Sequence, residues 1–316
     1  METRRLQSFL TIVDTGSLTR AAMALNIAQP ALSQQLANLE SHFQQKLLIR
    51  SQQGVTPTEA GLVLYRYARS ILKHVEQAEA DVRRAMNALT GNVSVGLAPY
   101  SAGSTLSLSL LKAAREKFPD ILLHISEGFG GAFSELIMTA RLDMAVMHGA
   151  GPMRGISFHP LLVEEFYLVA PVEMSLPGEK ADGIPLSELA ETPLLLPTRV
   201  NFVRKAVDSA FSSIRQTPRI VAEIESVSTL RDAIGEAAGA AILPWSVANQ
   251  VAIPSRSTIR RICNPKIEDT VSLCVSDHMP LSEAAVAIRG LLLDVALKAA
   301  SSGFWQDSRR PDAPAA

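Results

Sequence analysis

The sequence predicts an α-helical winged helix-turn-helix module with a long linker helix, followed by a larger α/β domain. Three observations predict this fold class. Short helical patterns with tight turns fill residues 1–43, an apolar heptad pattern runs over 68–89, and strands alternate with helices from 93 onward. The chain has 316 residues, 47% of them hydrophobic, and can therefore bury the cores of two or three domains.

The first part of the chain contains three short helical patterns. Apolar residues recur at helical spacing in the first: Leu6, Phe9, Leu10 and Val13. Gly16 ends that helix, and Ser17 suits the N-cap of the second. A tight connection follows at 26–27, and Pro30 suits the first position of a third helix. This order indicates helix-turn-helix geometry.

The third helix, expected over 30–43, has two contrasting faces. One face is apolar and is expected to be buried: Leu32, Leu36, Leu39 and Phe43. The opposite face is polar but uncharged: Pro30, Gln34, Ala37, Asn38 and Ser41, with Ser33 on its flank. A helix that only faces water is normally rich in Glu and Lys. Short and amide-bearing side chains favour base reading, since Gln can pair with adenine in the major groove. An ordinary solvated face is the alternative.

The segment KLLIRSQQGVTPTEAG, residues 46–61, predicts a two-stranded wing with a polar turn at 51–54. Arg50 can lie against a phosphate or in the minor groove. After the wing, Thr56 can cap a helix that begins with Pro57, and Thr58 is the rival cap. The wing would complete the DNA-binding module.

The helix after the wing carries a heptad seam. Its members are spaced alternately by three and four residues: Ala68, Ile71, Val75, Ala78, Val82, Ala85 and Leu89. So long and narrow a seam favours pairing with a second copy of the chain, and packing on its own domain is the alternative. A dimer would hold two reading helices at a fixed spacing on a pseudo-palindromic DNA site.

The segments SLTRAAMALNIAQPALSQQLANLE and LLIRSQQGVTPTEAG, with the seam helix, resemble the DNA-binding module of LysR-type transcriptional regulators. The resemblance implies base contacts by Gln29, Pro30, Ser33 and Gln34 and a wing contact by Arg50. The wing tip departs from the family, which often has basic residues where this chain has glutamines at 52–53. We therefore expect a weaker wing contact and less salt-dependent affinity.

The family resemblance also implies partners. Such regulators bind double-stranded DNA as dimers or tetramers, activate transcription by contacting RNA polymerase, and often repress their own gene. Within the family, the front module and the run AEIESVSTL resemble the subfamily that controls nitrogen assimilation. A regulator of a catabolic operon that responds to a small carboxylate is the alternative.

The remaining two-thirds of the chain reads as α/β, with near-continuous apolar strands. Three clusters of polar residues follow strands at predicted helix starts, where ligands of such sheets bind. They are Tyr100, Ser101, Ser104, Thr198, Arg199, Asn201, Ser226, Ser228 and Thr229. Helix capping is the simpler role for each hydroxyl or amide. Arg199 is a candidate counter-charge for a small carboxylate, although an exposed Arg without a ligand is the simpler alternative.

The resemblance implies that this region is an effector-binding domain similar to periplasmic binding proteins, with two lobes around a cleft. Some family members act without a small-molecule effector. The expected boundaries are a DNA-binding domain at 1–58, a linker helix and hinge at 59–90, an effector domain at 91–303 and a disordered tail at 304–316. Lobe one would comprise 92–165 and 268–303, and lobe two 166–267, with crossovers near 166–170 and 263–271.

Patterns for other function classes are missing from the sequence. It contains no GxSxG, P-loop, HExxH or complete GxGxxG motif, and its six histidines lack metal-ligand spacing. We therefore expect no enzymatic activity, no catalytic residue, no metal and no cofactor. His148 follows a predicted strand, where a structural role is simpler than a ligand contact. Cys263 and Cys274 have no redox spacing and suggest a reducing compartment.

Charge and hydropathy favour a cytoplasmic DNA-binding protein. Residues 1–90 carry ten Lys and Arg against seven Asp and Glu, whereas the remainder carries twenty against twenty-four. No apolar run reaches the roughly 18 residues of a membrane span, and the N-terminus lacks a signal-peptide core. The back half alone would suit an extracytoplasmic solute-binding protein, but residues 1–90 argue against that class.

Overall fold

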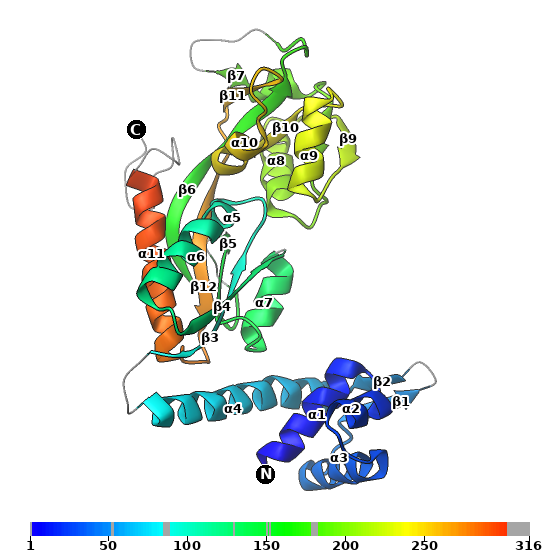
Figure 1. The fold of residues 1–316 in the computed structure, drawn as a ribbon. Helices are drawn as coiled ribbons and strands as arrows, with labels where there is room; N and C mark the ends of the chain where they lie inside the picture. The colour runs from blue at the N-terminus through cyan, green and yellow to red at the C-terminus, as the bar shows by residue number, and fades with distance from the viewer. Residues whose placement is uncertain are drawn as a thin grey trace. The chain divides into compact units, whose positions relative to one another are not determined.

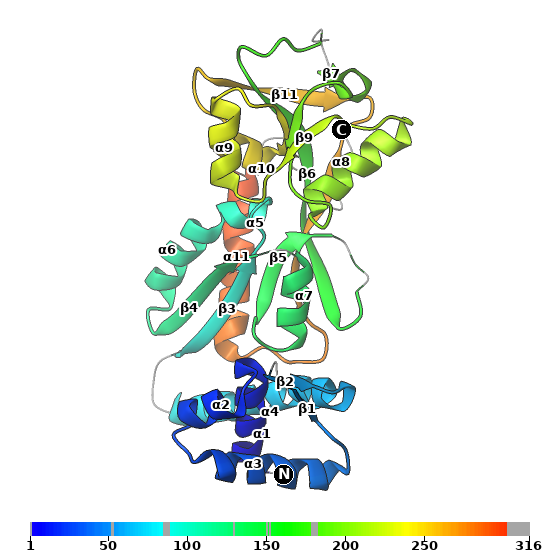
Figure 2. The ribbon, with the colours of Figure 1, turned by 90° about the vertical axis from the view of Figure 1, so that its right-hand side faces the viewer.

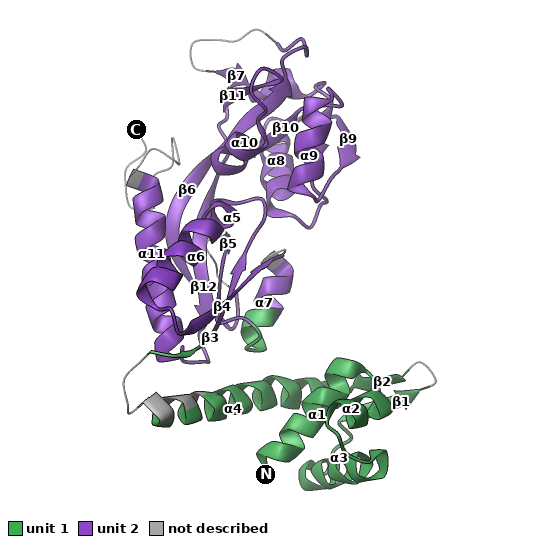
Figure 3. Cartoon of the chain, in the orientation of Figure 1, with its two compact units in different colours: residues 1–91, 136–141 green, residues 92–135, 142–316 purple. Residues whose placement is uncertain are grey.

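The computed structural model describes residues 2–51, 54–84, 89–128, 130–149, 151, 153–177 and 183–301. The chain forms two compact units (Figure 3). Unit 1 comprises residues 1–91 and 136–141, and unit 2 comprises 92–135 and 142–316. The tail predicted at 304–316 lies outside the described residues.

Unit 1 is a winged helix-turn-helix module followed by a long helix, which confirms the predicted fold class (Figure 1). Its elements are α1 (Thr3–Thr15), α2 (Leu18–Ala24), α3 (Gln29–Phe43), β1 (Leu48–Ser51), β2 (Gly54–Pro57) and α4 (Glu59–Arg84). The two strands pair antiparallel and form the wing. Helix α1 ends at Gly16 in the left-handed conformation, and Ser17 caps α2 by accepting the N–H of Arg20.

The start of α4 follows the rival register. Thr58 is the cap, because its Oγ1 accepts the N–H of Gly61 at 3.0 Å. The prediction of Thr56 as cap was wrong, since Thr56 lies in β2 and pairs with Ile49. Its extended backbone belongs to the wing and cannot begin the helix.

The core of unit 1 is made by one face of each helix. Buried side chains come from all four: Leu6, Phe9, Leu10, Ile12, Leu18, Ala21, Ala22, Leu32, Leu36, Leu39, Leu64, Tyr65 and Ala68. The prediction that Phe43 is buried was wrong, because its side chain is 39% exposed. Phe43 is the last residue of α3, one turn beyond the buried Leu39, and its ring lies edge-on to His42.

Unit 2 contains two lobes that share the long strand β6 (Ile156–Pro171) (Figure 2). Lobe one contains β3 (Gly91–Leu97), α5 (Ala102–Thr105), α6 (Ser107–Lys117), β4 (Ile121–Glu127), α7 (Gly130–Met138), β5 (Met144–His148), β12 (Glu268–Ser276) and α11 (Glu283–Ser301). The first residue of β3 and the last three residues of α7 are counted in unit 1. Helices α6 and α11 cover one face of its sheet, and α7 covers the other (Figures 1 and 2).

Lobe two is built on the second half of β6. It contains β7 (Ile184–Pro185), a 3-10 helix (Leu186–Leu189), β8 (Leu194–Leu196), α8 (Phe202–Ser213), β9 (Ile220–Glu223), α9 (Val227–Gly235), β10 (Ala241–Pro244), α10 (Trp245–Val251) and β11 (Ser257–Cys263). Strand β6 pairs with β12 through Glu165, and with β10 from Phe166. The change of partner marks the passage between lobes and fits the predicted two-lobed α/β fold.

The strand order of the large sheet is β4-β3-β5-β12-β6-β11-β7, with β10 also on β6. Parallel and antiparallel pairs are mixed, and the inner strands are buried, as their apolar runs predicted. No helix in the described ranges is both long and apolar enough to cross a membrane.

Candidate DNA-binding face and regulatory domain

One face of α3 is exposed and uncharged. Gln29, Pro30, Gln34 and Asn38 are exposed, and Ser33 is half-buried beside them. The buried side chains of the same helix are all leucines: Leu32, Leu36 and Leu39. The face predicted to read bases is therefore open to a partner, while the leucines hold the helix to its module.

The amide of Gln34 is oriented by a neighbour one turn away. Its Nε2 donates to Asn38 Oδ1 at 3.0 Å, and Gln34 Oε1 with a second N–H remains available. That remaining pair matches the acceptor and donor that adenine requires in the major groove. The next residue of α3 is held by α1, because Ser8 Oγ on α1 donates a hydrogen bond to Gln35 Oε1 at 2.5 Å.

The end of α3 is tied to the start of the wing by Glu40. Its carboxylate accepts from Lys46 Nζ at 2.8 Å and from the N–H of Leu47 at 3.0 Å. Burial acts to raise the pKa of Glu40, but the Lys46 ammonium and the N–H groups of Leu47 and Leu48 outweigh it and hold the pKa below its usual value. Glu40 therefore stays charged and fixes the angle between α3 and the wing.

The wing presents Arg50 to solvent. Arg50 is exposed and pairs with Val55 across the ladder. Gly54 has φ 122°, and a Cβ there would lie 2.7 Å from the carbonyl oxygen of Gly16, so this close approach requires glycine. The wing-tip glutamines at 52–53 lie outside the described residues.

The predicted seam of α4 divides into two parts. Ala68 is fully buried and Ile71 packs half-buried against the core of unit 1, so the alternative of packing on its own domain holds for these two. Val75, Ala78 and Val82 are exposed, with 36% and 77% exposure for the two valines. Exposed valines at heptad spacing are unusual on a solvated helix, and within the described residues of unit 1 they form an uncovered apolar stripe.

The far end of the seam differs from the prediction. Helix α4 is described to Arg84, Ala85 lies outside the described residues, and Leu89 is not helical. The sequence predicted one helix through Leu89, but the TGN stretch at 90–92 leads into β3, which begins at Gly91.

A cluster of partly exposed polar side chains joins helix α4 to α1. Tyr65 Oη donates to Asp14 Oδ1 at 2.6 Å, and Arg69 contacts the other oxygen of Asp14 and lies over the Tyr65 ring. The cluster fixes the direction in which the linker helix leaves the module. The sequence did not predict it, because the partners lie 51 and 55 residues apart.

The first predicted effector cluster caps a short helix. Ser101 is fully buried, accepts the N–H of Gly103 at 3.0 Å and donates to the carbonyl of Ala98 at 2.9 Å. Ser104 Oγ donates to the carbonyls of Pro99 and Ser101. Both hydroxyls are thus engaged with their own backbone.

Asn201 and Ser226 are also caps. Asn201 Oδ1 accepts the N–H of Val203 at 3.0 Å and begins α8. Ser226 Oγ accepts the N–H of Thr229 at 3.3 Å and lies 2.9 Å from Ser228 Oγ, at the exposed start of α9. Helix capping, the simpler of the two roles that the sequence allowed, therefore accounts for these contacts.

Members of the first two clusters nonetheless bind residues 224–225, which directly precede Ser226 in the chain. The Glu225 carboxylate accepts from the N–H and hydroxyl of Thr198 and from Asn201 Nδ2. Tyr100 Oη donates to the carbonyl of Ile224 at 2.9 Å, and its ring belongs to the core of lobe two. Burial, together with the charge of Glu225, raises the pKa of Tyr100 far above its usual value. A carboxylate of the chain itself thus occupies the polar start of α8.

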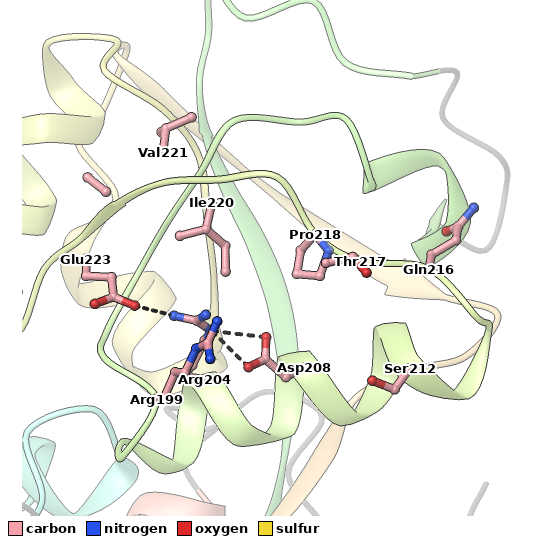
Figure 4. Close-up of a pocket in the computed structure, with 11 residues that line it drawn as sticks. Arg199, Arg204, Asp208, Ser212, Gln216, Thr217, Pro218, Ile220, Val221 and Glu223 are labelled. Carbon is pink, nitrogen blue, oxygen red and sulfur yellow. Dashed lines mark hydrogen bonds and ion pairs between the residues drawn. The ribbon is translucent and has the colours of Figure 1, made fainter.

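Arg199 lines a separate pocket of about 610 Å³ between α8 and β9 (Figure 4). Arg204 also lines this pocket and is paired with Asp208 at 3.0 Å and Glu223 at 2.8 Å. The described residues lining this pocket include no other predicted effector group. The structure therefore does not bring Arg199 together with the serines near 101.

Comparison with known proteins decides the family. The family profile for bacterial regulatory helix-turn-helix proteins of the LysR family matches residues 3–62, and that for the LysR substrate binding domain matches 87–297. The chain belongs to the LysR family. It is a DNA-binding transcriptional regulator, and the resemblance of its front module to this family is confirmed.

Two relatives of this LysR regulator are similar over nearly its whole length. The nitrogen assimilation regulatory proteins nac of Escherichia coli strain K12 and of Klebsiella aerogenes are each 42% identical to it over 295 residues, which cover 93% of this chain and 95% of theirs. A solved full-length OxyR from Pseudomonas aeruginosa has the same fold, with a TM-score of 0.73 and 22% identity over 94% of both chains.

Two parts of the LysR regulator's site were missed from the sequence. The i,i+4 spacing of Gln34 and Asn38 could have predicted their hydrogen bond. Nothing local predicted that Glu225 binds Thr198, because the two residues belong to different segments.

Proposed function

We propose that this LysR regulator binds an interrupted palindrome as a dimer and controls genes for nitrogen assimilation. The proposal that α3 reads DNA bases rests on the exposed, uncharged face of this helix and on the Gln34 amide that Asn38 orients. The exposed valines of α4 support the dimer, because pairing would bury them. Two identical reading helices would read two half-sites related by symmetry.

The nitrogen assignment is supported by 42% identity to two proteins named as nitrogen assimilation regulators. Genome-wide occupancy of the tagged protein, under nitrogen-rich and nitrogen-poor growth, tests it. We expect peaks at promoters of genes for using poor nitrogen sources, sharing one interrupted palindrome.

Sharp peaks confined to one neighbouring catabolic operon would overturn the nitrogen assignment and favour the alternative of a pathway-specific regulator. No discrete peaks in either condition would contradict the proposed reading helix as well. A strain carrying Gln34→Ala is the matched control, since its peaks should weaken without loss of the folded protein.

Arg50 is proposed to contact DNA phosphate, because it is exposed on the wing. Arg50→Ala should lower affinity on specific and random duplexes by a similar factor and reduce the slope of log affinity against log salt by about one. Fluorescence anisotropy over a salt series measures both. A loss restricted to the specific duplex, or an unchanged salt slope, would contradict the phosphate contact.

Further partners of the regulator are proposed from the family resemblance. They are RNA polymerase as the target of activation and a second dimer in a tetramer. A small-molecule effector is also proposed. A small carboxylate at the start of α8 would replace the Glu225 side chain and accept the hydrogen bonds of Thr198 and Asn201. The support for a carboxylate is that these groups already bind one.

A further inference from the structure

His148 lies where the two lobes of unit 2 meet. It ends β5 in lobe one, and its side chain is fully buried. Its ring stacks on Phe202, the first residue of α8 in lobe two, with centroids 3.6 Å apart and planes at 14°. The ring of Phe166 meets it edge-on at 6.5 Å. His148 is therefore a contact between the lobes in addition to their shared strands.

Each nitrogen of His148 faces a carboxylate. Nε2 lies 3.5 Å from Glu164 Oε2 on β6, and Nδ1 lies 3.3 Å from Asp269 Oδ2 on β12. A neutral imidazole has one N–H and one lone pair, so one of its nitrogens would turn a lone pair toward an anion. Only the protonated ring presents an N–H to both. The charge on the ring is important here because Glu164 is 1% exposed, and a buried carboxylate needs a compensating positive charge.

Stacking on Phe202 also favours the charged ring. An aromatic face attracts a cation placed over it, and the attraction is larger away from water. We propose that protonated His148 is a latch that holds the start of α8 in lobe two against lobe one, and that loss of its proton releases α8.

The direction of the pH response follows from the groups that face His148. Burial acts to lower the pKa of His148, but Asp269 and Glu164 outweigh it, and the net pKa lies above its usual value. Among the described residues, the other packed elements contribute the uncharged rings of Phe202 and Phe166, and the N–H of Ala102 that binds Glu164. Below the unfolded-state pKa of about 6.5 the latch contributes its full stabilisation of the folded state. That contribution is lost as pH rises through the pKa of His148 in the folded protein.

A second contact between the lobes does not share this response. Tyr100, in the loop before α5, inserts into the core of lobe two and donates to the carbonyl of Ile224. Its pKa is raised by burial, so the hydroxyl stays protonated where His148 titrates. The lobes therefore keep one fixed contact when the latch releases, and α8 is the part expected to loosen.

The protonation state of His148 in the full-length protein is measured by NMR of histidine-labelled protein, with His148→Gln used to assign its signal. We expect an imidazolium signal at pH 7, and a pKa that falls in Phe202→Leu, which keeps apolar bulk but removes the aromatic face. A neutral His148 at pH 7 would overturn the proposal, and the protonation state itself is read from the wild-type protein.

Release is measured by hydrogen–deuterium exchange of α8, corrected for the intrinsic effect of pH. Below pH 6.5 we expect α8 to exchange at least about tenfold faster in His148→Gln than in the wild type, with the difference shrinking as pH rises. At low pH the melting temperature of His148→Gln should lie roughly 5–10 °C below that of the wild type, and this difference should also shrink as pH rises. His159→Gln is the control, because His159 is exposed on β6 and should behave as wild type. Unchanged α8 protection in Phe202→Leu would overturn the latch.

Discussion

Val75→Asp is expected to convert the proposed dimer of the regulator to monomers. Val75 and Val82 lie one heptad apart on the exposed side of α4, and pairing would place each against a second copy. Burying an unpaired carboxylate in that seam should weaken dimerisation by on the order of 100-fold or more. Light scattering at micromolar concentration would then report the mass of one chain, and binding to a two-half-site operator would fall with it.

The matched control is His74→Asp, which adds the same charge one position away from the seam. His74 is exposed on the same helix, and a charge there remains in water. Both variants should keep the helical content of the wild type. An unchanged dimer in Val75→Asp would show that α4 is not the pairing element.

Gln34→Ala is expected to lower affinity for the specific operator by about 1–3 kcal/mol and to leave binding to random DNA nearly unchanged. The reason is that Gln34 is exposed, carries no charge and has its amide oriented by Asn38. Removing the side chain would take away the proposed base contact without removing a phosphate contact. Competition binding with specific and random duplexes at one salt concentration measures the difference.

Gln45→Ala is the control for that experiment. Gln45 is exposed but lies beyond the end of α3, so its loss should change neither affinity. Equal losses on both duplexes in Gln34→Ala would contradict the base-reading role and favour the alternative of a solvated polar face.

Periodic patterns were sufficient to predict the DNA-binding module. The leucines of α3 are buried and the polar face opposite them is exposed, because a helix that packs on one side must follow its 3.6-residue period. The pattern could not predict that Phe43 is exposed, since the core ends before the helix does. It also could not choose between Thr56 and Thr58, because both precede suitable residues and only strand pairing removes Thr56.

The regulatory domain was less predictable for a physical reason. Polar residues at helix starts can cap or bind, and only the fold shows which partners come near. Glu225 meets Thr198 and Asn201 from another segment, and the carboxylates of Glu164 and Asp269 meet His148 from two different strands. The sequence therefore indicated polar groups at helix starts but not that the chain supplies their partners.

Helix α3 is proposed to read bases in two symmetric half-sites. Selection of bound duplexes from a random DNA pool, followed by sequencing, tests it most directly with wild type and Gln34→Ala side by side. We predict that the wild type enriches an interrupted palindrome and that Gln34→Ala loses the preference at one base pair in each half-site while keeping the spacing. Enrichment of no sequence by the wild type, or identical preferences in the two proteins, would contradict the claim.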